Sequence, residues 1–298
     1  MRFKVWSHPI EISYSTTLLS KATLFYVVSS LLTVVPPLII AYRSQGFWIK
    51  SATYSEQPDI HFKHTLIVIL EKSDGTDLIW SSRESDLELE GDRVRIPVIR
   101  SREEDGNRDG VLDSLWLNLE MPMDGSEEIT GVQALLLFDY KLKRFSYFEM
   151  TGLVYLTGQG SAGRSFQCSG DIQLIQRQPL SHRGRDSRYI ESPLAGEPPL
   201  HLAEILRNYG ARNISLRVEN SYSVWRRGTG VENFVLELNL NYPSQTVEYI
   251  PGFWQTIKGG WIQYLSVLVV FIYLFNSIKT FVFSQQILPT IIETPWKQ

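Results

Sequence analysis

The stretch ATLFYVVSSLLTVVPPLIIAY (residues 22–42) contains no charged residue between Lys21 and Arg43. A second stretch, GGWIQYLSVLVVFIYLFNSI (259–278), is uncharged between Lys258 and Lys279. A helix of about 20 apolar residues crosses the hydrocarbon core of a bilayer, and each stretch reaches that length. The sequence therefore predicts a membrane protein with transmembrane helices at 22–42 and 259–279.

Two features of the first stretch bear on this prediction. Pro36 and Pro37 are expected to kink or break its helix, which a membrane span tolerates when neighbouring groups satisfy the freed carbonyls. A cleaved signal peptide is the alternative interpretation. The apolar region is too long for a signal peptide, however, and no A-x-A-like cleavage site follows it.

The basic residues near the two spans predict their orientation. The side that carries the chain termini has five, Arg2, Lys4, Lys21, Lys279 and Lys297, and the loop side has three, Arg43, Lys50 and Lys258. The positive-inside rule then makes 1–21 a cytosolic N-terminal segment, 43–258 an exoplasmic domain and 280–298 a cytosolic tail. Asn213 begins an Asn-Ile-Ser glycosylation sequon, which is compatible with an exported domain but is also expected by chance.

Composition limits the class of protein further. The chain of 298 residues has a formal charge of −3, which gives no reason to expect a nucleic-acid partner. Its single cysteine, Cys168, cannot form an intrachain disulfide, so the domain at 43–258 must depend on its own hydrophobic core.

The domain between the spans is predicted to be mainly β. Its apolar residues often alternate with polar ones, which is the pattern of half-buried strands. Expected strands are 60–70, 92–99, 114–121, 132–142, 145–156, 169–176, 213–225 and 232–242. Eight closely spaced strands favour a β-sandwich or an open barrel. One short helix is expected at 201–209, with Leu202, Ile205, Leu206 and Tyr209 on one face and Gly210 at its end.

A Gly-Phe-Trp triplet stands just outside each span, at 46–48 and 252–254. Tryptophan favours the headgroup layer because its ring is apolar while its N–H needs a polar partner. We therefore expect Trp48, Trp254 and Trp261 to be membrane-interface anchors. Packing in a protein core is the alternative for each of them.

The loop DGNRDGVLD (105–113) resembles a calcium-binding loop. The side chains of Asp105, Asn107, Asp109 and Asp113, with the carbonyl of Val111, would supply the oxygen ligands that calcium prefers, and Gly110 would permit the sharp turn. Trp116 stands where an EF-hand has its bidentate glutamate, so a structural calcium clamp in a β-hairpin is the form expected. The alternative is an acidic turn without a metal ion.

No motif indicates an enzyme or a small-molecule substrate. Gly158, Gly160 and Gly163 match G-x-G-x-x-G, but strand-like sequence follows them where a dinucleotide site needs a helix, so a flexible hairpin loop is expected there. His61 and His64 should face opposite sides of a strand and cannot easily share a metal. No nucleophile motif is found.

Particular strings in the chain resemble a known family. They are SHPIE (7–11), VVPPL (34–38), YRSQGFWIKSATYSEQP (42–58), GDRVRIPVI (91–99), SREEDGNRDGVLD (101–113), QRQPL (176–180) and YIPGFW (249–254). Together with the two spans they are similar to the transmembrane protein 231 family of the ciliary transition zone. The resemblance covers nearly the whole chain and is weakest in 157–170 and 181–232.

The resemblance implies a two-span protein with cytosolic termini and an exoplasmic domain, located at the base of the primary cilium. It implies partners among transition-zone membrane proteins: tectonics, B9-domain proteins and other members of the Meckel syndrome complex. That complex helps form the barrier that controls which membrane proteins enter the cilium, and ciliogenesis and Hedgehog signalling depend on it. The family implies no catalytic residue.

Two other functions remain as alternatives. A calcium-dependent receptor or adhesion module would bind a ligand through the β-rich domain. An auxiliary subunit of a channel or transporter is disfavoured because neither predicted span contains a buried ionisable residue.

Overall fold

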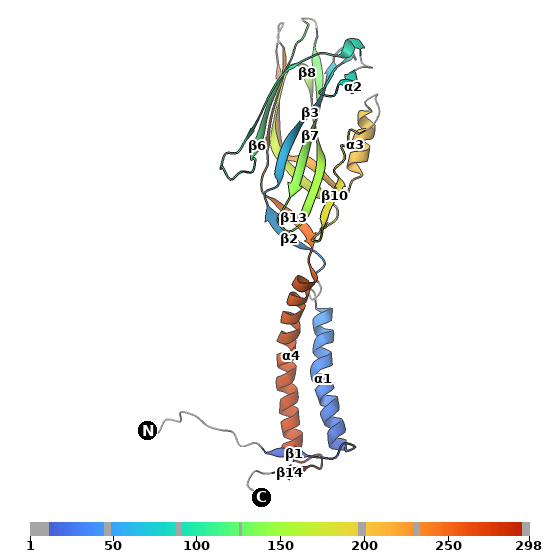
Figure 1. Ribbon diagram of the computed structural model, residues 1–298, viewed down its shortest axis with the longest axis vertical. Helices are drawn as coiled ribbons and strands as arrows, with labels where there is room; N and C mark the ends of the chain where they lie inside the picture. Colours follow the sequence, from blue (N-terminus) through green and yellow to red (C-terminus); the bar gives the residue numbers. More distant parts are fainter. Residues whose placement is uncertain are drawn as a thin grey trace, which may run out of the picture. The chain divides into compact units, whose positions relative to one another are not determined.

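The structure is a computed structural model and describes residues 12–44, 49–87, 91–124, 127–195, 201–228 and 233–293 (Figure 1). The chain divides into two compact units. Ser51–Ile250 forms a β-rich domain, and the flanking segments Met1–Lys50 and Pro251–Gln298 form a helical unit. The predicted fold class, a mainly β domain with a short helix between two apolar helices, is confirmed.

The described residues of the helical unit include the helices α1 (Lys21–Arg43) and α4 (Phe253–Ser284). Both are long and apolar enough to cross a membrane. Ser20 caps the start of α1 by accepting a hydrogen bond from the backbone N–H of Thr23 at 3.2 Å. Pro36 and Pro37 do not break α1, which continues to Arg43.

The two helices of this unit lie side by side and antiparallel (Figure 1). Small side chains of α1, Ser29, Pro37 and Ala41, are buried, and so are Thr256 and Gly260 of α4. Small residues let two helix backbones approach closely, which is how membrane helices pack in the absence of a hydrophobic driving force between them. Beyond the helices, β1 (Ser13–Ser15) pairs with β14 (Ile291–Glu293).

The β-rich domain contains one nine-stranded and one three-stranded sheet. The large sheet has the path β4-β3-β7-β8-β12-β6-β5, with β10 and β11 also paired to β8; the small sheet has the order β2-β13-β9. The strands are β2 (Ala52–Glu56), β3 (Asp59–Lys72), β4 (Asp77–Ser81), β5 (Val98–Glu104), β6 (Ser114–Met121), β7 (Ile129–Leu142), β8 (Tyr147–Gln176), β9 (Leu180–Ser181), β10 (Arg185–Tyr189), β11 (Ile214–Arg227), β12 (Phe234–Asn241) and β13 (Gln245–Ile250). The helices are α2 (Glu84–Leu87), the 3-10 turn Gly91–Arg93 and α3 (Leu202–Gly210).

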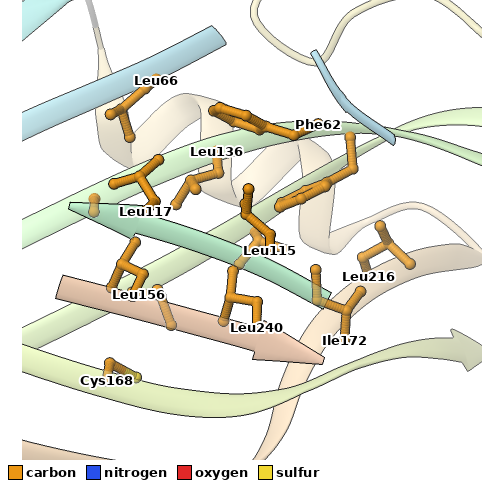
Figure 2. Close-up of a cluster of buried hydrophobic side chains, with 14 of the residues drawn as sticks. Phe62, Leu66, Leu115, Leu117, Leu136, Leu156, Cys168, Ile172, Leu216 and Leu240 are labelled. Atoms are coloured by element: carbon orange, nitrogen blue, oxygen red, sulfur yellow. The ribbon is translucent and has the colours of Figure 1, made fainter. Parts of the chain in front are cut away.

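One long strand, β8, joins the two halves of the large sheet. Its first half pairs with β7, whereas its second half pairs with β11 on one side and β12 on the other. Side chains from β3 and β7, such as Leu66 and Leu136, meet side chains from β6 and β12, such as Leu117 and Leu240, in one buried cluster (Figure 2). Cys168 of β8 belongs to the same cluster, and burial raises the pKa of its thiol. The sheet thus folds back on itself like a sandwich.

Strands β3 and β7 are buried on both faces, which explains their nearly continuous apolar sequences. Leu66, Val68 and Leu70 face the main core, while Ile67 and Ile69 face a second cluster on the other side of the sheet. Helix α3 covers that second cluster through Tyr209, with Leu202, Ile205 and Leu206 packed against it. The predicted helix and its apolar face are confirmed.

The prediction of a hairpin loop at the glycine motif is wrong. Residues 157–168 continue β8 without interruption, so the two strands expected at 145–156 and 169–176 are one. The glycines make room for aromatic rings. A β-carbon on Gly158 would lie 2.3 Å from the ring of Phe166, and β-carbons on Gly160 and Gly163 would lie 2.3 and 2.1 Å from Trp225.

The strand expected at 92–99 is also displaced. Gly91–Arg93 forms a 3-10 turn, and β5 begins at Val98. Pro97 has no N–H to contribute to a strand ladder, and the side chains of Ile96 and Val98 are 75% and 55% exposed. The alternating pattern there therefore does not mark a buried face.

Candidate functional site

The loop Asp105–Asp113 connects the antiparallel strands β5 and β6. Its acidic and amide side chains accept hydrogen bonds from the backbone of the same loop. Asp105 accepts from the N–H groups of Arg108 and Gly110 at 2.6 and 3.0 Å, and Asp109 accepts from Val111 at 2.8 Å. Arg108 and Gly110 have positive φ angles of 60° and 87°, a conformation that these bonds stabilise.

Asp113 closes the loop at its other end. Its Oδ2 accepts from the backbone N–H groups of Gly106 and Asn107 at 2.9 and 3.3 Å, and its Oδ1 accepts from Gln57 Nε2 at 2.8 Å. The hydrogen bond from Gln57, followed by those from the backbone, lowers the pKa of Asp113. The ionised Asp113 carboxylate therefore stabilises the folded state fully above the ordinary aspartate pKa. This stabilisation is lost as the pH falls through the lower pKa that Asp113 has in the folded state.

The loop brings the predicted ligands Asp105, Asn107, Asp109 and Asp113 together, but their oxygens already accept backbone hydrogen bonds. Val111, whose carbonyl was expected to be a ligand, donates its N–H to Asp109. In the described parts of the chain, no group of three or more His, Cys, Asp or Glu residues is placed to hold a metal ion. Structural calcium stays a prediction.

We expect millimolar calcium to raise the melting temperature of the reconstituted full chain by about 2–4 °C over the value in chelator, if calcium binds the loop. Asp109→Asn should abolish this difference, because it retains a hydrogen-bond acceptor but removes a charge. Asp74→Asn is the matched control, since Asp74 caps Thr76 in another exposed turn. Equal melting temperatures of the wild type with and without calcium would contradict the hypothesis.

The sequon residue Asn213 lies between α3 and β11, and its side chain is exposed. Its backbone carbonyl accepts a hydrogen bond from the N–H of Arg177 at 2.9 Å, which fixes the local chain. The side-chain nitrogen of Asn213, to which a glycan would be attached, lies 3.2 Å from the side-chain amide of Gln178. Its glycosylation remains a prediction.

Two of the three expected interface tryptophans can be placed. Trp254 and Trp261 lie on α4, and their side chains are 81% and 56% exposed within the structure. Each contacts a neighbouring ring edge to face: Phe253 for Trp254 and Tyr264 for Trp261. Such exposure does not fit core packing, but their position at a membrane interface remains a prediction. Trp48 lies outside the described residues.

Helix α4 extends beyond the end of the second predicted span. Lys279 was taken as the end of the second span, but α4 continues to Ser284. Lys279 Nζ lies 3.0 Å from Ser30 Oγ and 4.8 Å from the centre of the Tyr26 ring, both on α1. The apolar run Phe281-Val282-Phe283 beyond Lys279 is the sequence feature that favours a longer helix.

A β-rich domain carried between two long apolar helices defines a two-span transmembrane protein. Comparison with known families is more specific: the family model described as Transmembrane protein 231 matches residues 1–292. The chain belongs to this family.

Relatives named Transmembrane protein 231 support the assignment. The protein from Rattus norvegicus is 39% identical over 97% of this chain and 94% of its own length. Those from Xenopus tropicalis and Homo sapiens are 38% identical, over 97% of this chain and 95% and 94% of their own lengths. Among solved structures, a cryo-EM structure of a proton-activated chloride channel aligns with a TM-score of 0.25 and 7% identity over 86% of this chain and 95% of that chain, which is too weak to carry an argument.

Proposed function

We propose that this chain is a structural membrane component of the ciliary transition zone. In this role it acts with tectonics, B9-domain proteins and other members of the Meckel syndrome complex in the barrier that selects ciliary membrane proteins. Ciliogenesis and Hedgehog signalling depend on that barrier. The observation that carries the proposal is membership of the transmembrane protein 231 family over residues 1–292.

The architecture supports a scaffold rather than a catalyst. The acidic loop at 105–113 uses its carboxylates to hold its own turn, and the single cysteine is buried in the core. A β-rich domain held to the membrane at both ends can present a fixed surface to neighbouring membrane proteins. In the proposed orientation the termini are cytosolic and the domain is exoplasmic.

We expect an endogenously tagged copy, imaged by super-resolution microscopy with basal-body and axoneme markers, to form a ring just above the basal body. Loss of the protein should let membrane proteins that are normally excluded enter the cilium, and a wild-type copy should restore their exclusion. Signal spread over the plasma membrane, with unchanged ciliary composition, would contradict the barrier role. That outcome would favour the calcium-dependent receptor or adhesion module.

A further inference from the structure

Lys279 lies deep in the apolar part of the helix pair. Its ammonium contacts Ser30, which is nine residues after Lys21 and therefore about 13 Å along α1 from that end. The middle residue of the uncharged stretch 22–42 is Leu32, two residues further on. If the bilayer is centred on this stretch of α1, the ammonium lies close to the middle of the hydrocarbon core, and the part of α4 that crosses the core extends past Lys279 toward Ser284.

Two other contacts between α1 and α4 agree with a helix alignment that places Lys279 beside Ser30. The rings of Phe25 and Phe283 are 5.9 Å apart on one side of Lys279, and Ser44 Oγ lies 3.3 Å from Gln263 Oε1 on the other. The Cα–Cβ bond of a helical residue tilts toward the N-terminus of its helix. For Lys279 this direction is toward Phe253 and away from Ser284, and the contact of its ammonium with Ser30 agrees with it.

The charge of Lys279 lacks a counter-charge from its own helix pair. Its two contacts, the hydroxyl of Ser30 and the ring of Tyr26, are both uncharged. Neither Lys21–Arg43 nor Phe253–Ser284 contains an aspartate or a glutamate. A second copy of this chain therefore cannot supply a carboxylate from its spans. An ammonium at this depth is costly unless it is paired, and such residues generally face a partner inside the membrane.

Asn276 is a second polar group on α4, and it indicates the side of the helix on which such a partner would lie. Asn276 precedes Lys279 by three residues, so the two lie on neighbouring positions of one helix face. The side chain of Asn276 is exposed, and its amide has no hydrogen-bond partner among the residues that the structure describes. An exposed amide facing lipid is unfavourable, but between helices it can form hydrogen bonds.

We propose that the face of α4 formed by Asn276 and Lys279 binds a transmembrane helix of another protein, one that carries an aspartate or glutamate near its midpoint. The carboxylate pairs with the Lys279 ammonium while Ser30 and Tyr26 hold that ammonium in place. The Asn276 amide donates or accepts a hydrogen bond one turn away. Lipid headgroups are a poorer match, since their phosphates lie outside the hydrocarbon core.

The test uses the full chain, labelled with a donor fluorophore and reconstituted in phosphatidylcholine vesicles at neutral pH. The probes are acceptor-labelled single-span leucine-alanine peptides with aspartate, asparagine or leucine at the midpoint. We expect energy transfer to show association with the aspartate probe about tenfold stronger than with the leucine probe. Equal association of wild-type chain with these two probes overturns the proposal, and so does an asparagine probe that binds as well as the aspartate probe.

Variants assign the effect to Lys279. Lys279→Met should remove the preference for the aspartate probe, Lys279→Arg should retain it, and Lys279→Asp should transfer it to a probe with a central lysine. Lys258→Met is the matched control, because Lys258 is an exposed lysine near the other end of α4. An unchanged preference in Lys279→Met overturns the proposal. So does a preference that phosphatidylserine abolishes in the wild type, since it would identify a lipid as the occupant.

Discussion

Tyr209→Phe is expected to lower the free energy of unfolding of the β-rich domain by about 2–4 kcal/mol. The Tyr209 hydroxyl is buried and accepts two backbone hydrogen bonds, from the N–H of Leu153 in β8 at 3.0 Å and from the N–H of Leu216 in β11 at 2.7 Å. Phenylalanine fills the same space but leaves both N–H groups buried without an acceptor, and each such group costs about 1–3 kcal/mol.

Chemical denaturation of the reconstituted chain, followed by tryptophan fluorescence, measures this loss. Tyr222→Phe is the control, because the Tyr222 side chain is 77% exposed; its effect should stay within about 0.5 kcal/mol. Equal stabilities of the Tyr209→Phe and Tyr222→Phe variants would show that water replaces the hydroxyl and that α3 does not hold β8 and β11 together through Tyr209.

The double variant Gly160→Ala, Gly163→Ala should lose about 3 kcal/mol of stability, because both added methyl groups would overlap the indole of Trp225. That ring packs against Phe166 and Phe234 at centroid distances of 6.1 and 6.0 Å and cannot move without disturbing them.

A double-mutant cycle separates this steric effect from backbone effects. In a Trp225→Leu background, the two alanines should cost much less than in the wild type. Gly210→Ala serves as the control glycine, since a β-carbon there would meet no atom within 4 Å, and it should be neutral or slightly stabilising. A cost for the two alanines that does not depend on Trp225 would refute this explanation of the glycines.

These glycines also show where inference from sequence fails. The strand Ser114–Met121 and the apolar face of α3 follow from patterns within a few residues, and both were predicted. The conformation of Gly160 and Gly163 depends on Trp225, which is more than 60 residues away in the chain. Local sequence alone, rich in glycine and serine, is typical of a turn, so β8 was predicted as two strands.

The candidate sites also combine features that the local sequence predicts with features that it does not. The residues of the 105–113 loop are close in sequence, so their grouping in one turn could be predicted, whereas their hydrogen bonds to the loop backbone could not. The position of the Lys279 ammonium along α1 depends on how the two helices are aligned, and its contact with Ser30 gives that position. The residues next to Lys279 in the sequence do not predict how α4 is aligned with α1.

Because β2 pairs with β13, the small sheet can be completed only after the end of the domain has been synthesised. Tyr249 lies opposite Ala52, so the first strand of the domain is completed by its last. The ribosome delivers β13 just before Phe253, where α4 begins. Until then β2 and β9, which both pair with β13 in the small sheet, have an open edge to which other chains can add. A premature stop before Gln245 therefore yields a domain that cannot close, and quality control should degrade it rather than release a shortened, partly working protein.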